Sequence, residues 1–249
     1  MQAKRILILG GTGEARALAA LLVDAGHDVT TSLAGVTEKP MMLKGKPRIG
    51  GFGGVEGLRD YLRVQKVDVV VDATHPFAVQ ISRHAALACD GVQLLRLERP
   101  AWVKQVGDHW IDVADVSRAV AALPYGANVF CTIGRKEVGA IVERSDLSGV
   151  ARMIEPPPTP PTERWKLLLQ RPPFSLASEI ALMRENEITH VVSKNAGGGE
   201  TENKIAAARQ LGIPVVMIAR PTKPVVAGFS SPQDIADHIS KLGRISHSS

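Results

Sequence analysis

The chain has 249 residues, of which 45% are apolar and 22% are charged. That length allows one large domain or two small ones with a sizeable core. A net charge of only +5 and an ordinary apolar content exclude an intrinsically disordered chain. The three Trp, two Tyr and five Phe are scattered along the sequence, which argues against a protein that stacks single-stranded nucleic acid on aromatic side chains.

The N-terminus and the cysteines indicate a cytoplasmic protein. Ile6–Leu9 is a short apolar run that glycines interrupt at once, unlike a signal peptide, and no stretch reaches the roughly 18 apolar residues of a membrane helix. Cys89 and Cys131 show neither a CxxC motif nor metal-ligand spacing, so we expect two reduced thiols. No metal, membrane or nucleic-acid partner is therefore expected.

Short β-branched runs alternate with longer helical stretches along the whole chain. The expected strands are Arg5–Gly10, Asp28–Leu33, Val67–Asp72, Val92–Leu97, Asn128–Ile133, Val150–Ile154, Lys166–Leu169, Thr189–Ser193 and Pro214–Ala219. The expected helices are Gly13–Ala25, Val55–Gln65, Pro76–Ala88, Asp115–Leu123, Leu176–Glu185, Thr201–Leu211 and Pro232–Leu242. Continuous Val, Ile and Leu runs suit strands that are covered on both faces. The alternation therefore predicts an α/β fold with mostly parallel sheets.

The number of expected strands favours two domains over one. The strands exceed what a single doubly wound sheet usually holds, and the pattern restarts near Asn128. We therefore expect two Rossmann-like domains, residues 1–105 and 106–249, whose sheets face a shared cleft. The segment after residue 220 could pack on either domain. The proline-rich run Pro156–Pro161 is expected to be an extended connector within the second domain.

The first candidate site is the glycine-rich turn between the first strand and the first helix. It reads Gly10-Gly11-Thr12-Gly13-Glu14-Ala15-Arg16. Glycines let the backbone turn sharply and approach a pyrophosphate, whose charge the N–H groups of the helix start can bind. Arg16 stands where the dinucleotide fingerprint has its third glycine. The turn favours nucleotide binding, and a purely structural strand-to-helix turn stays open.

The end of the second expected strand favours NADP over NAD. An NAD site usually carries Asp or Glu at this position, whereas this strand ends in Thr31 and Ser32. The two hydroxyls could bind a 2′-phosphate, with Arg16 or a lysine of the following loop neutralising its charge. Alternatively, they only cap the strand end.

The second candidate site is the segment Asp72-Ala73-Thr74-His75-Pro76-Phe77-Ala78. It follows an expected strand, and Pro76 suits the first position of a helix. Thr74 and His75 would then lie at the carboxyl edge of the sheet, where ligands bind in this architecture. His75 could donate a proton near neutral pH, or it could form a structural hydrogen bond.

Two basic, glycine-containing loops follow expected strands of the second domain. They are Thr132–Glu137, which contains Arg135 and Lys136, and Ser193–Glu200, which contains Lys194, Gly197 and Gly198. Glycines allow close backbone approach to a ligand, and the cations, together with Lys204, could contact an acidic substrate. Any one of these charges alone would be interpreted as a solvated surface residue.

These motifs, in this order, resemble the precorrin-6A reductase family of corrin-ring (vitamin B12) biosynthesis. The resemblance covers about residues 5 to 221 and rests on the segments Ile8–Arg16, Asp72–Ala78, Leu97–Trp102, Thr132–Lys136, Ser193–Gly198 and Pro214–Pro221. It implies two Rossmann-like domains around a cleft and an NADPH-dependent reduction of one ring double bond of precorrin-6A, giving precorrin-6B. It also places Gly10, Gly11, Thr12 and Gly13 in the cofactor site.

Combining the motifs with the resemblance gives a set of expected site residues. NADPH is expected to contact Gly10, Gly11, Thr12, Gly13, Glu14, Arg16, Thr31, Ser32 and Thr74. The tetrapyrrole polycarboxylate is expected to contact Arg135, Lys136, Ser193, Lys194, Gly197 and Gly198, and His75 is expected to donate or orient a proton.

Three other functions remain open at this point. One is a non-catalytic NADP-binding regulatory module, and another is a reductase of the cobalt-loaded ring. The third is a short-chain or nucleotide-sugar reductase. That class uses a Tyr-x-x-x-Lys pair, and neither Tyr61 nor Tyr125 has a lysine four residues further on.

Overall fold

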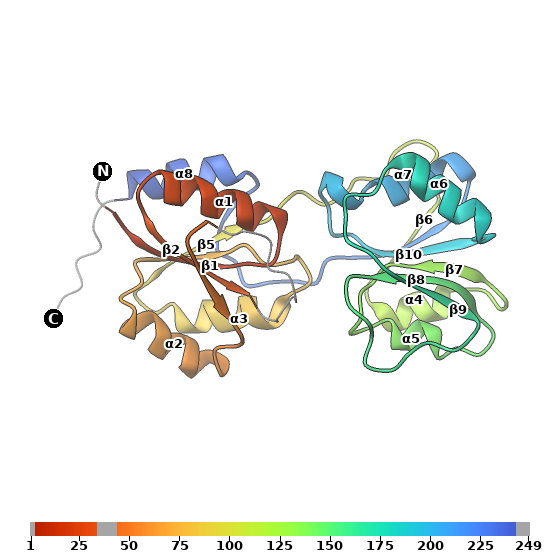
Figure 1. Cartoon of the computed structure of the whole chain (residues 1–249), viewed down its shortest axis with the longest axis horizontal. Coiled ribbons are helices and arrows are strands. Elements are labelled where there is room, and N and C mark those ends of the chain that lie inside the picture. The colour runs from red at the N-terminus through yellow and green to blue at the C-terminus, as the bar shows by residue number, and fades with distance from the viewer. Residues whose placement is uncertain (1–2, 34–43, 243–249) are drawn as a thin grey trace. The chain divides into compact units, whose positions relative to one another are not determined.

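The fold is given by a computed structural model that describes residues 3–33 and 44–242 (Figure 1). The chain divides into two compact units. The first unit comprises residues 1–100 together with 221–249, and the second comprises residues 101–220. Each unit is a doubly wound α/β domain built on one parallel sheet.

The sheet of the first unit has six described strands in the order β12-β5-β4-β1-β2-β3, all parallel. These strands are β1 (Arg5–Leu9), β2 (Asp28–Leu33), β3 (Lys46–Ile49), β4 (Val69–Asp72), β5 (Gln93–Leu97) and β12 (Ala227–Phe229). Helices α1 (Gly13–Asp24) and α8 (Pro232–Lys241) cover one face, while α2 (Gly54–Val64) and α3 (Val79–Ala88) cover the other (Figure 1).

The apolar run of β1 explains why this sheet is covered on both faces. Side chains alternate across a strand, so Ile6 and Ile8 enter a core with α1 and α8, while Leu7 and Leu9 enter a core with α2 and α3. All four side chains are at most 2% exposed. Each contributes roughly 1.5–3 kcal/mol by burial, which fixes β1 at the centre of the unit.

The second unit has a sheet of six described parallel strands in the order β6-β11-β10-β7-β8-β9. The strands are β6 (Trp110–Val113), β7 (Asn128–Cys131), β8 (Ser148–Met153), β9 (Trp165–Leu169), β10 (His190–Lys194) and β11 (Val215–Ile218). Helices α6 (Leu176–Glu185) and α7 (Asn203–Leu211) cover one face, and α4 (Val116–Ala122) and α5 (Gly139–Val142) cover the other (Figure 1). A 3₁₀ turn, η1 (Gly199–Thr201), precedes α7.

The two units exchange their sixth strands. The chain passes from β5 to β6, yet β6 pairs with β11 of the second sheet, and it passes from β11 to β12, yet β12 pairs with β5 of the first. The remaining five strands of each sheet follow the same order. The chain therefore crosses between the units twice, near residues 100 and 220.

This exchange shifts the division of the chain from the expected one. Residues 101–105 belong to the second unit, where Trp102 packs among buried side chains. The segment after residue 220, which the sequence left open, returns to the first unit because Ile235 and Ile239 of α8 complete its core. That the two sheets face a shared cleft stays a prediction.

Each of the nine expected strands is present, with shifts at the ends, and β3, β6 and β12 are additional. All three are edge strands of three or four residues with mostly exposed or half-buried side chains. They therefore lack the continuous apolar run by which the interior strands were predicted. The short helix α5 is also additional, and α3 begins at Val79 rather than Pro76. No helix in the described ranges is long and apolar enough to cross a bilayer.

Candidate functional site

Each sheet has a switch point where successive connections leave to opposite faces. In the first unit it lies between β1 and β4, whose following helices α1 and α3 cover opposite faces (Figure 1). In the second unit it lies between β7 and β10. Ligands of doubly wound folds bind at the carboxyl ends of the strands beside such a point. All four loops that the sequence singled out lie at these two points.

The first two residues of the turn after β1 must be glycines. An ideal Cβ on Gly10 would lie 2.7 Å from Cγ2 of Thr31, and the Gly10 amide donates to the Ser32 carbonyl at 2.9 Å. Gly11 has a φ of +114°, a left-handed conformation that side chains rarely adopt. A side chain at either position would push the turn away from β2 or strain its backbone.

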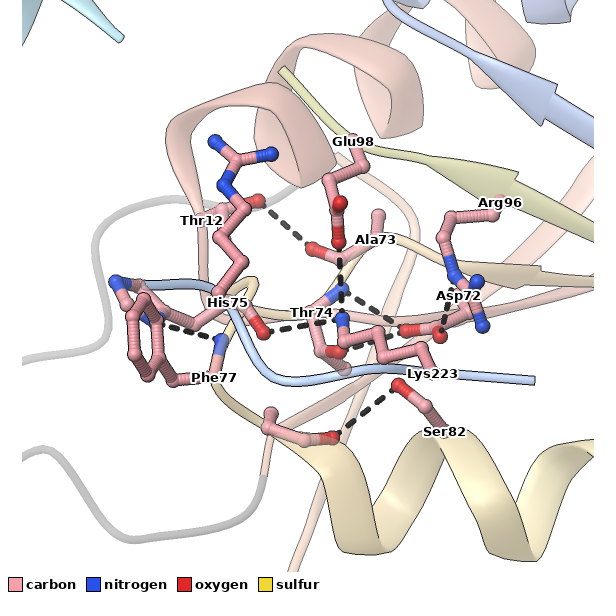
Figure 2. Close-up of polar contacts among 12 residues, drawn as sticks. Thr12, Asp72, Ala73, Thr74, His75, Phe77, Ser82, Arg96, Glu98 and Lys223 are labelled. Carbon is pink, nitrogen blue, oxygen red and sulfur yellow. Dashed lines mark hydrogen bonds and ion pairs between the residues drawn. The ribbon is translucent and has the colours of Figure 1, made fainter. Parts of the chain in front are cut away.

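Thr12 joins this turn to the loop after β4. Its buried hydroxyl accepts from the Ala15 amide at 3.1 Å, capping α1. The same hydroxyl donates to the Ala73 carbonyl at 2.8 Å (Figure 2). The two loops at the switch point are thereby held together by one side chain. The hydroxyl of Thr12 is thus engaged within the protein.

The first turn of α1 carries unused amide donors. Within the described residues, the amides of Gly13 and Glu14 donate to no protein acceptor, as expected at a helix start. The Glu14 carboxylate pairs with Arg99 at 2.9 Å, so its charge is already balanced. Arg16 is half-buried one turn further on. The donors here suit an anion.

The end of β2 presents two buried hydroxyls. Thr31 is 1% exposed, and its Oγ1 has no hydrogen-bond partner in the described part of the chain. Ser32 is also buried, and its hydroxyl lies 3.5 Å from Nη1 of Arg48 on β3. A buried hydroxyl without a partner beside a bare glycine turn indicates a place where a ligand completes the hydrogen bonding.

Arg48 is a cation that the sequence analysis missed. It donates to the carbonyls of Gly50 at 2.6 Å and Gly51 at 2.9 Å, and its guanidinium lies 3.8 Å from the ring centre of Phe52. Its side chain is thus fixed beside Ser32. Sequence reasoning assigned this charge to Arg16 or to a lysine of the loop after β2, and residues 34–43 of that loop lie outside the described ranges. The sequence could have indicated Arg48 as a site residue only if the edge strand β3, on which it lies, had been predicted.

The loop after β4 is organised by Asp72, which is 1% exposed (Figure 2). Its carboxylate accepts from the Thr74 hydroxyl at 2.6 Å and amide at 3.3 Å, and from Nε of Arg96 at 3.2 Å. Burial raises the pKa of Asp72, but the hydroxyls of Ser82 and Thr74 and the charges of Lys223 and Arg96 outweigh it and hold the pKa below its ordinary value. The hydroxyl of Thr74 is therefore committed to Asp72.

His75 is exposed at the tip of this loop. Its Nδ1 accepts from the Phe77 amide at 3.3 Å (Figure 2), and its carbonyl accepts from the Ala78 amide at 2.8 Å. Because Nδ1 acts as an acceptor, the neutral ring carries its proton on Nε2. The turn from His75 to Ala78 precedes α3, so His75 is held by a loop rather than by the helix.

Lys223, which the sequence analysis also missed, supports the His75 loop from a distant part of the chain. Its buried ammonium donates to the His75 carbonyl at 3.3 Å and to Glu98 at 3.1 Å (Figure 2). The neighbouring Pro224 carbonyl accepts from Arg96 at 2.8 Å. These contacts join segments more than 120 residues apart, and no local pattern signals them.

In the second unit, an ion pair between Lys194 and Glu137 links the two loops at the switch point. Arg135 pairs with Glu155 at 2.8 Å, while Lys136 is exposed. Two of the predicted substrate-binding cations therefore have carboxylate partners within the protein. Their positive charge is available to a substrate only in part.

The loop after β10 is fixed by Asn195. Its side chain accepts from the Trp102 amide at 2.8 Å and donates to the Trp102 carbonyl at 3.0 Å. Arg220 donates to the carbonyls of Asn195 at 2.9 Å and Ala196 at 3.0 Å. The indole N–H of Trp102 donates to the Gly198 carbonyl at 3.0 Å. Both chain crossings therefore end on this loop.

The other residues predicted in this loop play mixed roles. Ser193 is 1% exposed and donates to the Lys194 carbonyl at 3.2 Å, while Gly197 and Gly198 adopt φ values of +68° and +79°. Lys204 is buried over the ring of Trp102 at 4.7 Å. Its ammonium supports the loop from inside, so the expectation that Lys204 contacts substrate is not supported.

The two cysteines are separate buried or half-buried thiols. Neither Cys89 nor Cys131 forms a disulfide, and burial raises the pKa of both thiols to about 12. They therefore remain protonated and are poor nucleophiles. The described residues contain no group of three or more His, Cys, Asp or Glu side chains that could hold a metal ion.

Comparison with known proteins gives a consistent result. Residues 5–240 match the family model described as precorrin-6x reductase CbiJ/CobK. The chain is 48% identical to a precorrin-6A reductase of Rhodococcus erythropolis, over 97% of this chain and 98% of that one. A solved structure of CobK precorrin-6A reductase matches with a TM-score of 0.89 and 41% identity, covering 95% and 96% of the two chains. A cobalt-precorrin-6A reductase of Priestia megaterium is 30% identical, over 87% and 90%.

We predict that Asp72→Asn lowers the free energy of unfolding by about 3 kcal/mol at pH 7, because it leaves the Arg96 charge buried without its partner. The folded-state pKa of Asp72 lies below its ordinary value of 3.8, so its contribution is present at neutral pH and is lost as the pH falls below 3.8. The difference between variant and wild type should therefore shrink in acid.

Denaturant unfolding at pH 7 and below pH 4 measures both effects. The exposed Asp112 on β6 provides the control, and Asp112→Asn should change stability by less than about 0.5 kcal/mol. Equal stability of the two variants at pH 7 would contradict the role assigned to Asp72.

Proposed function

The chain belongs to the precorrin-6x reductase family and reduces a C=C bond of precorrin-6A in cobalamin biosynthesis, and we propose that NADPH is the hydride donor. We further propose that the natural substrate is the metal-free ring, which gives precorrin-6B. The observation that carries this choice is the 48% identity to a precorrin-6A reductase over nearly both full lengths, against 30% to a cobalt-precorrin-6A reductase.

The first unit has the features that a dinucleotide needs. Gly10 packs so closely on Thr31 that it admits no Cβ, Gly11 adopts a left-handed turn with open space beside it, and α1 presents unused amides next to them. Thr31 adds a buried hydroxyl without a described partner. These groups fit a pyrophosphate and the adjoining ribose. NADPH, when bound, supplies the hydride.

Ser32 and Arg48 support the choice of NADPH over NADH. No carboxylate stands at the end of β2, where an NAD site usually has one for the ribose 2′-hydroxyl. Arg48 instead offers a planar cation that Gly50, Gly51 and Phe52 already hold in place. A guanidinium fixed in this way binds a phosphate with little loss of side-chain freedom.

The reaction also needs a proton. Addition of a hydride to one carbon of the double bond leaves a negative charge that a proton on the neighbouring carbon must neutralise. His75 is exposed at the carboxyl edge of the sheet, and in its imidazolium form Nε2–H would be the donor, which leaves a neutral ring. We assign proton donation, or orientation of a donating water or substrate carboxyl, to His75.

The substrate carries many carboxylates, and a cationic protein suits such a ligand. The net charge of +5 favours its approach. Lys136 is exposed on the loop after β7, and Gly197 and Gly198 open the backbone of the loop after β10. We propose that this edge of the second sheet, including Arg135, Ser193 and Lys194, binds the substrate.

The direct experiment is anaerobic mixing of the protein with precorrin-6A and NADPH, following nicotinamide absorbance at about 340 nm. We expect oxidation that depends on precorrin-6A and is slower with NADH. Oxidation only with the cobalt-loaded ring would move the protein to the cobalt route. Tight NADPH binding without oxidation by either ring would favour a non-catalytic regulatory module.

Substitution of Arg48 tests the cofactor preference. Arg48→Gln should raise KM for NADPH by about tenfold or more and leave KM for NADH nearly unchanged, since a hydrogen bond to a charged group contributes about 1.5–3 kcal/mol. Arg63→Gln, on the exposed side of α2, removes the same charge from the same unit as a control. An equal effect on both nicotinamides would argue against a 2′-phosphate contact.

Substitution of His75 tests the proton donor. His75→Ala should lower kcat by about 10² while KM for NADPH changes little, because general acid catalysis typically contributes this much. His84→Ala on α3 serves as the matched control. If kcat is unchanged, His75 has no chemical role.

A further inference from the structure

The second unit contains a pocket outside the two switch-point loops. Its volume is about 380 Å³, and it is lined by Arg152, Gln170, Arg171, Phe174, Ser178 and Leu182. Arg152 belongs to the carboxyl end of β8, Gln170 and Arg171 follow the end of β9, and Ser178 and Leu182 belong to α6. The pocket therefore opens at the carboxyl edge of the sheet, beneath the start of α6.

The inner wall of this pocket is rigid and electrically balanced. Both terminal nitrogens of the Arg152 guanidinium, Nη1 and Nη2, donate to the Glu179 carboxylate, at 2.6 and 3.0 Å, and both side chains are at most 6% exposed. The guanidinium also lies 3.6 Å from the ring centre of Phe174 and 4.8 Å from that of Phe130. Arg152 thus shapes the wall, and Glu179 cancels its charge.

The rim, in contrast, carries a positive charge that the protein does not balance. Arg171 is exposed and forms no ion pair with any residue in the described ranges. Gln170 and Ser178 add polar groups beside it, and Phe174 and Leu182 add apolar surface. This combination suits an anion at the end of a short aliphatic stem, because the stem packs on apolar surface while the cation binds the charged end.

The position of the pocket relates it to the proposed substrate edge. Strands β10, β7, β8 and β9 are consecutive neighbours, and neighbouring strands lie about 4.8 Å apart. The end of β9 is therefore roughly 10 Å from the loop after β7 along the same edge. A tetrapyrrole bound at that edge has carboxylate-bearing side arms that reach outward over a comparable width.

We propose that this pocket is a carboxylate subsite in which Arg171 binds one acidic side arm of the tetrapyrrole. The inference rests on the proposed function, because it needs a substrate with peripheral carboxylates. Arg171 is a specificity residue here, and it takes no part in the transfer of hydride or proton.

The test compares two arginine variants that remove the same charge. Arg171→Gln should raise KM for precorrin-6A about tenfold, with kcat and KM for NADPH nearly unchanged, and Arg171→Lys should recover part of the loss. Arg184→Gln, in the last turn of α6 away from the pocket, should behave like the wild type. Added salt should weaken substrate binding less in Arg171→Gln than in the wild type.

A second variant places a negative charge in the pocket without endangering the fold. Ser178 lies in the first turn of α6, where an acidic side chain is favourable, so Ser178→Asp should preserve stability. It should nevertheless raise KM for precorrin-6A as much as Arg171→Gln does.

The outcomes separate this inference from the function on which it rests. Without wild-type oxidation of NADPH by precorrin-6A, the proposed function fails, and an absorbance titration of precorrin-6A then tests binding alone. The subsite is overturned if Arg171→Gln and Arg184→Gln behave alike in turnover or titration, or if the wild type does not bind the ring. It is also overturned if Arg171→Gln raises KM for NADPH instead, because the anion would then belong to the nucleotide.

Discussion

The exchange of sixth strands is the constraint on which the rest of the structure depends. After β5 the chain enters the second unit with β6, and the first sheet is completed only by β12, which follows the whole second unit, so the chain must cross between the units twice. Both crossings are bound to loops of the candidate site. Trp102 and Arg220 bind the loop after β10, while Lys223 binds the carbonyl of His75 after β4. The site loops are therefore ordered by long-range contacts as well as by their own strands.

Buried charge gives these loops their definite shape. Asp72, Arg96 and Lys223 form a cluster in which each charged group has a partner of opposite sign or a carbonyl acceptor. Pairs of this kind contribute little net stability, but removal of one partner is costly. The loop that carries His75 is consequently held in one arrangement, which suits the proposed role of His75 as a proton donor.

The sequence predicted the interior strands and one edge strand, β9, but missed the other three edge strands. The interior strands are continuous apolar runs because helices cover both faces, and that pattern is local. Edge strands β3, β6 and β12 are short and partly exposed, so their side chains carry no comparable signal. Arg48 was missed for this reason, since it lies on β3.

The candidate site residues, too, were predicted where the sequence signal is local and missed where it is not. Gly10, Gly11 and Thr12 could be identified because a glycine turn between a strand and a helix is a local pattern with a definite geometry. Arg96 faces Asp72 from the paired strand β5. Lys223 reaches the His75 loop only after the chain has passed through the second unit and returned, so no spacing could reveal it. The sequence also could not show that Lys204 is buried against Trp102.

Five strands of each sheet follow the same order, yet the loops at the two switch points differ in chemistry. In the first unit, the turn after β1 leads into a helix of 12 residues whose first amides are unused, and bare glycines stand beside them. In the second, the turn after β7 leads into a helix of four residues, and the Lys194–Glu137 ion pair spans the loops. A four-residue helix has a weaker dipole, and the Glu137 carboxylate already balances the charge of Lys194. This difference supports the proposed assignment of the dinucleotide to the first sheet.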